Sequence, residues 1–162
     1  MLNKNYFLVI ATKKEDILIV QKKTLKKWEL PRIPSSKEEP IHTLAENYIK
    51  KHLSSLSYQI LGQSEVVDSY EWPKELASIT GKTGEEHRFI LVRLESEQVS
   101  RKNVISDELE TADLVSYDEL VEKVIFKNHR FILKRVLEDF RQRVKKDKEK
   151  YINPTTDEYL QL

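Results

Sequence analysis

The stretch that decides the fold of this chain is residues 17–53, ILIVQKKTLKKWELPRIPSSKEEPIHTLAENYIKKHL. It begins with a β-rich run at residues 17–21 and passes through a polar segment with three prolines. It ends in apolar residues at the i, i+3, i+4, i+7, i+8 and i+12 spacing of one helical stripe: Ile41, Leu44, Ala45, Tyr48, Ile49 and Leu53. Pro40 suits the first helical position, where its missing N–H has no consequence. We therefore expect a strand, a loop and an amphipathic helix in this order.

Outside this stretch, β-branched and aromatic content predicts three more strands, at residues 6–12, 57–70 and 87–94. The charged residues 13–16 predict a hairpin loop without glycine, and residues 71–86 predict a polar loop. Helices are expected at 117–124 and at 128–150, the second with a buried stripe of Phe131, Ile132, Val136, Leu137 and Phe140. This order of elements indicates an α/β or α+β sandwich in which helices cover a mixed sheet.

Length and composition limit the classes of protein. The 162 residues, 39% of them hydrophobic, favour one domain, which we place at residues 1–150, followed by a polar tail at 151–162. The absence of cysteine excludes disulfides, thiolate metal sites and a cysteine nucleophile, and is consistent with a cytoplasmic protein. Lys13 and Lys14 end the N-terminal apolar run well short of the roughly 20 residues that a membrane span needs, so we expect no membrane association.

Charge is balanced over the whole chain but not locally. The 28 Lys and Arg nearly cancel the 27 Asp and Glu. Residues 127–150, however, hold ten Lys and Arg against four acids. Such a helix face is most often simply solvated, and contact with a nucleic acid or a protein is the alternative reading.

Two parts of the chain resemble the Nudix hydrolases. Residues 17–23, then Trp28-Glu29-Leu30-Pro31, a loop and the amphipathic helix are similar to the segment that carries the family's box, G-x5-E-x7-R-E-U-x-E-E-x-G-U. With the first box glycine laid on Ile33, Glu39 matches the first glutamate and Ile49 the apolar position.

The second half matches independently. It resembles motifs of the branch that contains RNA pyrophosphohydrolases and dinucleoside tetraphosphate hydrolases, through Tyr70-Glu71-Trp72-Pro73, residues 84–91, Glu108, Leu114-Val115 and Phe126-Lys127. The resemblance covers roughly residues 6–140. It implies a Nudix-like α/β/α sandwich with a mixed sheet between helices.

The departures from the box concern its chemistry. In the same register Asn47 and Tyr48 replace the R-E pair, and Lys51 and His52 replace the E-E pair. The family uses those glutamates to hold Mg²⁺, which takes hard oxygen ligands. Lys51 puts a cation where the ion would sit, so we expect no metal site and no cofactor. The paired loop glycines are also replaced, by Arg32 and Ile33.

The resemblance supplies the candidate site residues. Glu39 and Glu108 are the candidate catalytic acids, although Glu39 precedes a helix start, where acids are also common for capping and dipole reasons. Trp28 and Trp72 stand in polar surroundings and could stack on a nucleobase. Cations near the family's cleft could hold phosphate directly; they are Arg32, Lys51, Arg88 and Lys127.

Three hypotheses follow. The first is a Nudix-fold protein with a decayed box that binds a nucleotide, a dinucleoside polyphosphate or an RNA 5′ end with little or no hydrolysis. The second is a working hydrolase of a phosphoanhydride bond, with Mg²⁺ or Mn²⁺ in a rearranged site of Glu39 and Glu108, to which Glu85 and Glu86 could contribute. The third is a protein-interaction module that uses the basic helix, and a protein partner or a homodimer also remains open.

Overall fold

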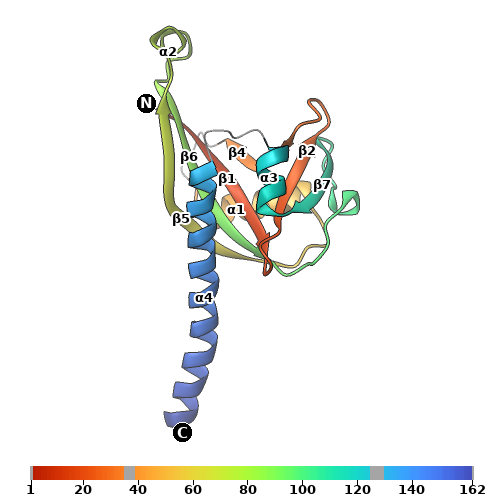
Figure 1. Cartoon of the computed structure of the whole chain (residues 1–162), viewed down its shortest axis with the longest axis vertical. Helices are drawn as coiled ribbons and strands as arrows, with labels where there is room; N and C mark the ends of the chain where they lie inside the picture. Colours follow the sequence, from red (N-terminus) through yellow and green to blue (C-terminus); the bar gives the residue numbers. More distant parts are fainter. Residues whose placement is uncertain (1, 35–38, 125–129, 162) are drawn as a thin grey trace.

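The computed structural model describes residues 2–34, 39–124 and 130–161 (Figure 1). Within these ranges seven strands form one mixed sheet: β1 (Leu2–Thr12), β2 (Ile17–Lys22), β3 (Trp28–Glu29), β4 (Arg32–Pro34), β5 (Tyr58–Glu71), β6 (Gly84–Leu94) and β7 (Leu109–Val115). The main order is β3-β2-β1-β6-β5, with β4 paired to β1 and β7 paired to β2. β1 and β6 run parallel, whereas the other pairs are antiparallel.

Helices cover both faces of the sheet. The helices are α1 (Ile41–His52), α2 (Lys74–Thr80), α3 (Tyr117–Lys123) and α4 (Arg130–Gln161), with a short 3-10 turn at Arg101–Asn103, and those that pack on the sheet are α1, α3 and α4. Successive residues of β1 point to opposite faces, so Tyr6, Leu8 and Ile10 join the core under α1. Phe7, Val9 and Ala11 join the core under α3 and α4. The predicted α/β sandwich with a mixed sheet between helices is therefore confirmed.

The predicted hairpin and amphipathic helix are present with small differences. β1 and β2 pair antiparallel, and Glu15 takes the positive φ of 66° that the glycine-free turn requires. Pro40 is the N-cap residue of α1 rather than its first helical residue, with extended backbone angles. The last residue of the predicted stripe, Leu53, is the C-cap. Pattern and structure thus agree to within one residue at each end of this helix.

Two expectations about helices were wrong. Phe131 is 79% exposed and does not belong to the buried stripe of α4. The buried positions are Leu133, Val136, Leu137 and Phe140, which follow the i, i+3, i+4, i+7 spacing. A residue two places before Leu133 lies about 200° around the helix, on the far side. The loop predicted at 71–86 also contains α2, at the tip of the hairpin that β5 and β6 form (Figure 1).

A bulge in β5 ties α4 to the sheet. The pairing of β5 with β6 shifts between Gln63 and Val67, which frees backbone groups from the ladder. Asp139 of α4 satisfies two donors there: the Ser64 hydroxyl donates to its Oδ2 at 2.6 Å, and the Glu65 N–H donates to the same oxygen at 3.0 Å. Arg143 lies one turn further along α4 and donates to the Gln63 carbonyl at 3.0 Å. The position of α4 on the sheet is therefore fixed by polar contacts as well as by its apolar stripe.

The tip end of the same hairpin is held by a close backbone approach. Gly84 begins β6 opposite Glu71, and a Cβ built on it would lie 2.0 Å from the Tyr70 carbonyl oxygen. Only glycine fits there, which gives a physical reason for this residue in the motif that starts at residue 84.

The C-terminal part of α4 continues beyond the sheet (Figure 1). The helix extends through residues 151–161, most of the predicted tail. None of the helices in the described part of the chain combines the length and the apolar character needed to cross a membrane.

Candidate functional site

A cleft of about 430 Å³ opens between α1, β4 and the segment that precedes β7. Its lining residues are Arg32, Ile33, Pro34, Glu39, Leu44, Asn47, Tyr48, Lys51, His52 and Glu108. The five from α1 recur at the i, i+3, i+4, i+7, i+8 spacing, so one face of this helix forms a wall of the cleft. That face adjoins the buried stripe and shares Leu44 with it. The same helix thus covers the core and lines the cleft.

The four positions at which this chain departs from the R-E and E-E pairs of the Nudix box all line the cleft. Asn47 and Tyr48 occupy the R-E positions, and Lys51 and His52 occupy the E-E positions. The match to the box predicts that these four side chains lie at one site, and α1 does bring them to the same wall of the cleft.

Four of the eight predicted site residues line this cleft: Arg32 from β4, Glu39 ahead of α1, Lys51 from α1 and Glu108 ahead of β7. They come from segments as much as 76 positions apart in the sequence. Trp28, Trp72 and Arg88 do not line it, and Lys127 lies outside the described residues. The roles of all eight remain predictions.

Charge in the cleft is organised around Glu108. The Lys51 Nζ lies 3.4 Å from the Glu108 Oε1, and the His52 Nε2 lies 4.0 Å from its Oε2. Lys51 and Glu108 are both largely exposed, at 65% and 64% of their side-chain surface, so water screens their attraction. The ammonium beside Glu108 thus belongs to the residue that stands at a glutamate position of the box.

His52 is the buried member of this group. Its side chain is 7% exposed, its ring centroid lies 4.5 Å from that of Tyr48, and its Nδ1 has no hydrogen-bond partner among the described residues. Burial lowers the pKa of His52, Glu108 opposes this shift, and Lys51 adds to it. We therefore expect a neutral imidazole at neutral pH.

The neighbouring Tyr48 is also kept neutral. Burial raises the pKa of its hydroxyl, and the carboxylates Glu29 and Glu108 raise it further. Tyr48 packs against the core under α1 and lines the cleft as well. It therefore offers a neutral hydroxyl and an aromatic surface, rather than a charge, to whatever enters.

Glu39 lines the cleft and is exposed. Among the described residues no side chain makes a hydrogen bond at the N-cap of α1. The capping role that the sequence suggested for Glu39 is therefore not seen. Its carboxylate is available to the cleft.

The α1 wall of the cleft does not offer the donors that Mg²⁺ prefers. A Nudix site needs several carboxylate oxygens on the box helix, whereas α1 contributes an amide, a phenol, an ammonium and an imidazole. Throughout residues 2–34, 39–124 and 130–161, no three histidine or carboxylate side chains are grouped so that they could hold a metal ion. The residues present do not fit the family's metal.

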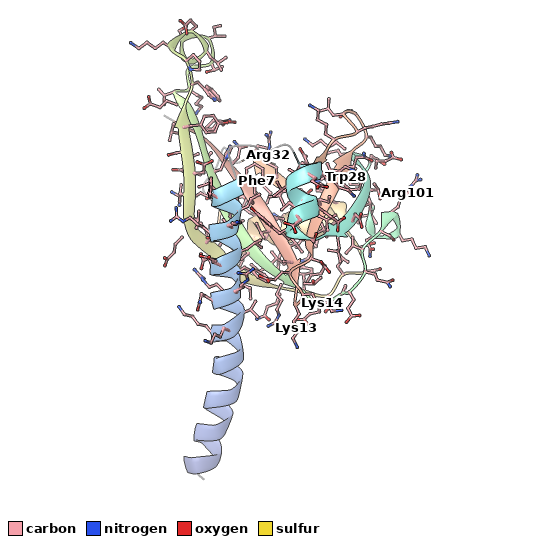
Figure 2. The ribbon with its side chains drawn as sticks, viewed as in Figure 1. Phe7, Lys13, Lys14, Trp28, Arg32 and Arg101 are labelled. Atoms are coloured by element: carbon pink, nitrogen blue, oxygen red, sulfur yellow. The ribbon has the colours of Figure 1, made fainter. Side chains whose placement is uncertain are left out.

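The other predicted ligand residues have partners elsewhere. Trp28 packs against the core under α3 and α4, on the face of the sheet opposite α1, and the Lys123 Nζ lies 5.5 Å from the centroid of its ring (Figure 2). Trp72 is half-buried in the short connection between β5 and α2. Figure 2 also labels Arg32, on the strand that borders the cleft. The two tryptophans thus lie apart from the cleft and from each other.

Arg88 faces the α1 side of the sheet without reaching the cleft wall. It pairs in register with Tyr6, which in turn pairs with Ile33 of the cleft. Its Nε donates to the Glu86 Oε2 at 2.9 Å, and this hydrogen bond raises the pKa of Arg88 and lowers that of Glu86. Glu85 lies on the opposite face, where it accepts a hydrogen bond from the Tyr70 hydroxyl. Neither glutamate lines the cleft, although the hydrolase hypothesis placed both near the metal.

The basic helix of the third hypothesis is α4. Its exposed cations include Lys134, Arg135, Lys145 and Lys146, whereas Arg141 pairs with Glu15 of the β1–β2 turn. Lys13 and Lys14 mark that turn in Figure 2, beside α4. The contact role of this surface stays a prediction.

Sequence reasoning undervalued two of the cleft residues. It placed Tyr48 in the apolar stripe and gave His52 no role beyond the loss of a box glutamate. The signal that could have identified them is their spacing from Lys51 and Asn47 on one helical face.

Neither a protein-family model nor a curated protein sequence matches this chain. Solved structures do share its fold. The Ap4A hydrolase of C. elegans, in a binary complex, has a TM-score of 0.60 at 14% identity, and the match covers 85% of this chain and 96% of the hydrolase. The dihydroneopterin triphosphate pyrophosphohydrolase of E. coli has a TM-score of 0.58 at 12% identity, with 80% and 92% covered.

A third structure is explicitly a Nudix domain. The NrtR Nudix domain of Shewanella oneidensis, solved with ADP ribose, has a TM-score of 0.55 at 10% identity, with 85% of this chain and 88% of that domain covered. The chain therefore has the Nudix fold, as its two sets of motifs predicted. At these identities the likeness concerns the fold alone, and the activity has to be argued from the cleft.

Proposed function

We propose that this chain is a Nudix-fold protein with a decayed catalytic box that binds a phosphate-bearing nucleotide in the cleft beside α1 and hydrolyses it little or not at all. The ligand class is a nucleotide, a dinucleoside polyphosphate or the 5′ end of an RNA, met in the cytoplasm. The Nudix domain solved with ADP ribose supports a ligand of this class for the fold.

One observation carries the proposal: the ion pair between Lys51 and Glu108, 3.4 Å apart in the cleft. Lys51 stands where the box has a metal-binding glutamate, so a positively charged ammonium replaces a negatively charged carboxylate there. Without several carboxylates the cleft cannot concentrate Mg²⁺ against the phosphates of a nucleotide. Arg32 and Lys51 can still contact phosphate oxygens directly.

A turnover assay tests the proposal. The purified protein is offered diadenosine tetraphosphate and a 5′-triphosphorylated RNA, with Mg²⁺ and with Mn²⁺, beside a Glu108→Gln variant. We expect the protein to release no nucleotide or pyrophosphate above the level of the variant. We also expect the protein to bind at least one of these two ligands measurably. Metal-dependent release that disappears in the variant would overturn the proposal and establish a hydrolase that uses Glu108.

The hydrolase remains the second candidate because Glu39 and Glu108 both line the cleft. The same assay with Glu39→Gln separates the two. Under our proposal this substitution leaves turnover at background, whereas a working hydrolase that uses both acids loses turnover in either variant.

A further inference from the structure

We infer that the cleft takes its ligand as a free phosphate or polyphosphate anion, without a divalent cation, and that Glu108 competes with this anion for Lys51. The inference rests on the proposed function, because it specifies how the same cleft binds. The ligand would then enter as the metal-free anion, whereas a metal-dependent hydrolase would act on the complex with the cation.

The charges that line the cleft suit an anion better than a metal complex. The cleft lining holds two permanent cations, Arg32 and Lys51, and two acids, Glu39 and Glu108. Glu108 lies beside Lys51, and the acids within the described part of the chain form no group that could hold a metal. A bound Mg²⁺–phosphate complex would place its metal next to Lys51, where like charges repel. A bare phosphate instead finds an ammonium and a guanidinium on the walls.

The ion pair between Lys51 and Glu108 can open readily. Both partners are about two-thirds exposed, and the contact is 3.4 Å long. Exposed pairs of this kind are held weakly, since each charge is well solvated when they separate. Lys51 has a flexible side chain on the last turn of α1, so its ammonium can exchange the carboxylate for a phosphate oxygen with no backbone movement.

Glu108 opposes the anion once Lys51 has exchanged partners. Its carboxylate stays at the cleft wall, where it repels the bound anion, and the neutral His52 beside it does not compensate. Glu108 is therefore an internal competitor. Removing its charge should free Lys51 and also remove the repulsion.

The test is isothermal titration calorimetry with ADP and with inorganic pyrophosphate, in EDTA and then in excess MgCl2. We expect the unmodified protein to bind at least one probe in EDTA and to bind it more weakly with Mg²⁺. Glu108→Gln should tighten binding in EDTA by about three- to tenfold. Lys51→Gln should weaken it about tenfold or more.

Two variants provide matched controls. Glu110→Gln removes the same charge two residues along the chain, from a side chain that pairs with Arg101 and does not line the cleft. Lys50→Gln removes a lysine next to Lys51 that pairs with Glu46. Each should change affinity by less than about twofold, since surface charges at a distance are screened. Circular dichroism confirms that each variant is folded.

The outcomes separate the inference from the proposed function. Binding that requires Mg²⁺, or a Glu108→Gln variant that binds no tighter than the unmodified protein, overturns the inference and leaves nucleotide binding in place. Absence of binding to either probe under both conditions, in folded protein, overturns both. Tighter binding by Glu108→Gln in EDTA, with Glu110→Gln unchanged, supports both.

Discussion

Lys51 and His52 occupy neighbouring positions on α1 where carboxylates would give the cleft a strongly negative potential. Replacing both with glutamate would set two acids beside Glu108 and Glu39. We expect this double variant to gain affinity for Mn²⁺ and Mg²⁺ by about tenfold or more, because hard cations bind clustered carboxylate oxygens. Calorimetric titration with each metal measures the gain.

Lys50→Glu is the matched control for this change, since it adds an acid to the same turn of α1 without lining the cleft. Its metal affinity should stay at the level of the unmodified protein. A folded double variant with unchanged metal affinity would show that our register for the box is wrong.

The buried His52 also predicts how stability depends on pH. Burial lowers its pKa in the folded protein below the ordinary value of about 6.5, so the unfolded chain binds a proton that the folded chain does not. The free energy of unfolding is therefore expected to be highest above pH 6.5 and to fall as the pH drops below it, until the folded pKa is reached.

Urea denaturation at several pH values between about 7.5 and 5 measures this dependence. His52→Leu removes the titrating group and keeps an apolar contact for Tyr48. We expect it to lose less stability over this range than the unmodified protein. Parallel curves for the two proteins would contradict the assignment of this pH dependence to His52.

At the scale of elements, the contact between α4 and the β5 bulge depends on Asp139. Its carboxylate accepts hydrogen bonds from the Ser64 hydroxyl and the Glu65 N–H, and Ser64 is only 2% exposed. Asp139→Ala leaves the buried hydroxyl without its acceptor and should lower the free energy of unfolding by about 1–3 kcal/mol. Urea denaturation followed by circular dichroism measures the loss.

Glu138→Ala is the control for this substitution, because Glu138 is the exposed neighbour on the same helix. It should change the free energy of unfolding by less than about 0.5 kcal/mol. Equal losses in the two variants would contradict the assignment of the effect of Asp139→Ala to the contact with the bulge, because alanine has a higher helix propensity than either acid.

The elements that the sequence predicts best are those with a long periodic pattern. The apolar stripe at 41–53 identified α1, and β-branched runs identified β1, β2, β5 and β6. Short strands such as β3 and β4 carry too few residues to show a period, and they form because neighbouring strands offer backbone partners. The prediction that Phe131 is buried was wrong because the stripe was chosen by residue type, whereas the angle around the helix decides burial.

At the scale of the molecule, the cleft could be predicted only in part. The match to the box predicted Arg32, Glu39 and Lys51 as neighbours because these residues are close in sequence, and a separate motif predicted Glu108. Trp28 lies outside the cleft because the side of a two-residue strand is set by the sheet around it, which no local pattern reveals. The Lys51–Glu108 pair joins residues 57 positions apart, so it required the folded structure.

The extent of the domain gives the last prediction. α4 packs on the sheet as far as Val144, and beyond the sheet it extends away from the body (Figure 1). A chain ending at Lys150 retains Asp139, Phe140 and Arg143, and with them every contact of α4 described above. We expect its Tm to stay within about 3 °C of that of the full chain, because the packing of α4 against the core that the structure describes ends at Val144. Differential scanning calorimetry measures both.

A chain ending at Glu138 is the opposite control, because it loses Phe140, one of the largest fully buried side chains, together with Asp139. Loss of a buried phenylalanine alone costs about 3–5 kcal/mol, a large part of the stability of a domain of this size. We expect this shorter chain to be unfolded. If the chain ending at Lys150 also melts far below the full-length protein, residues 151–162 contribute to the folded unit, and the boundary at residue 150 is wrong.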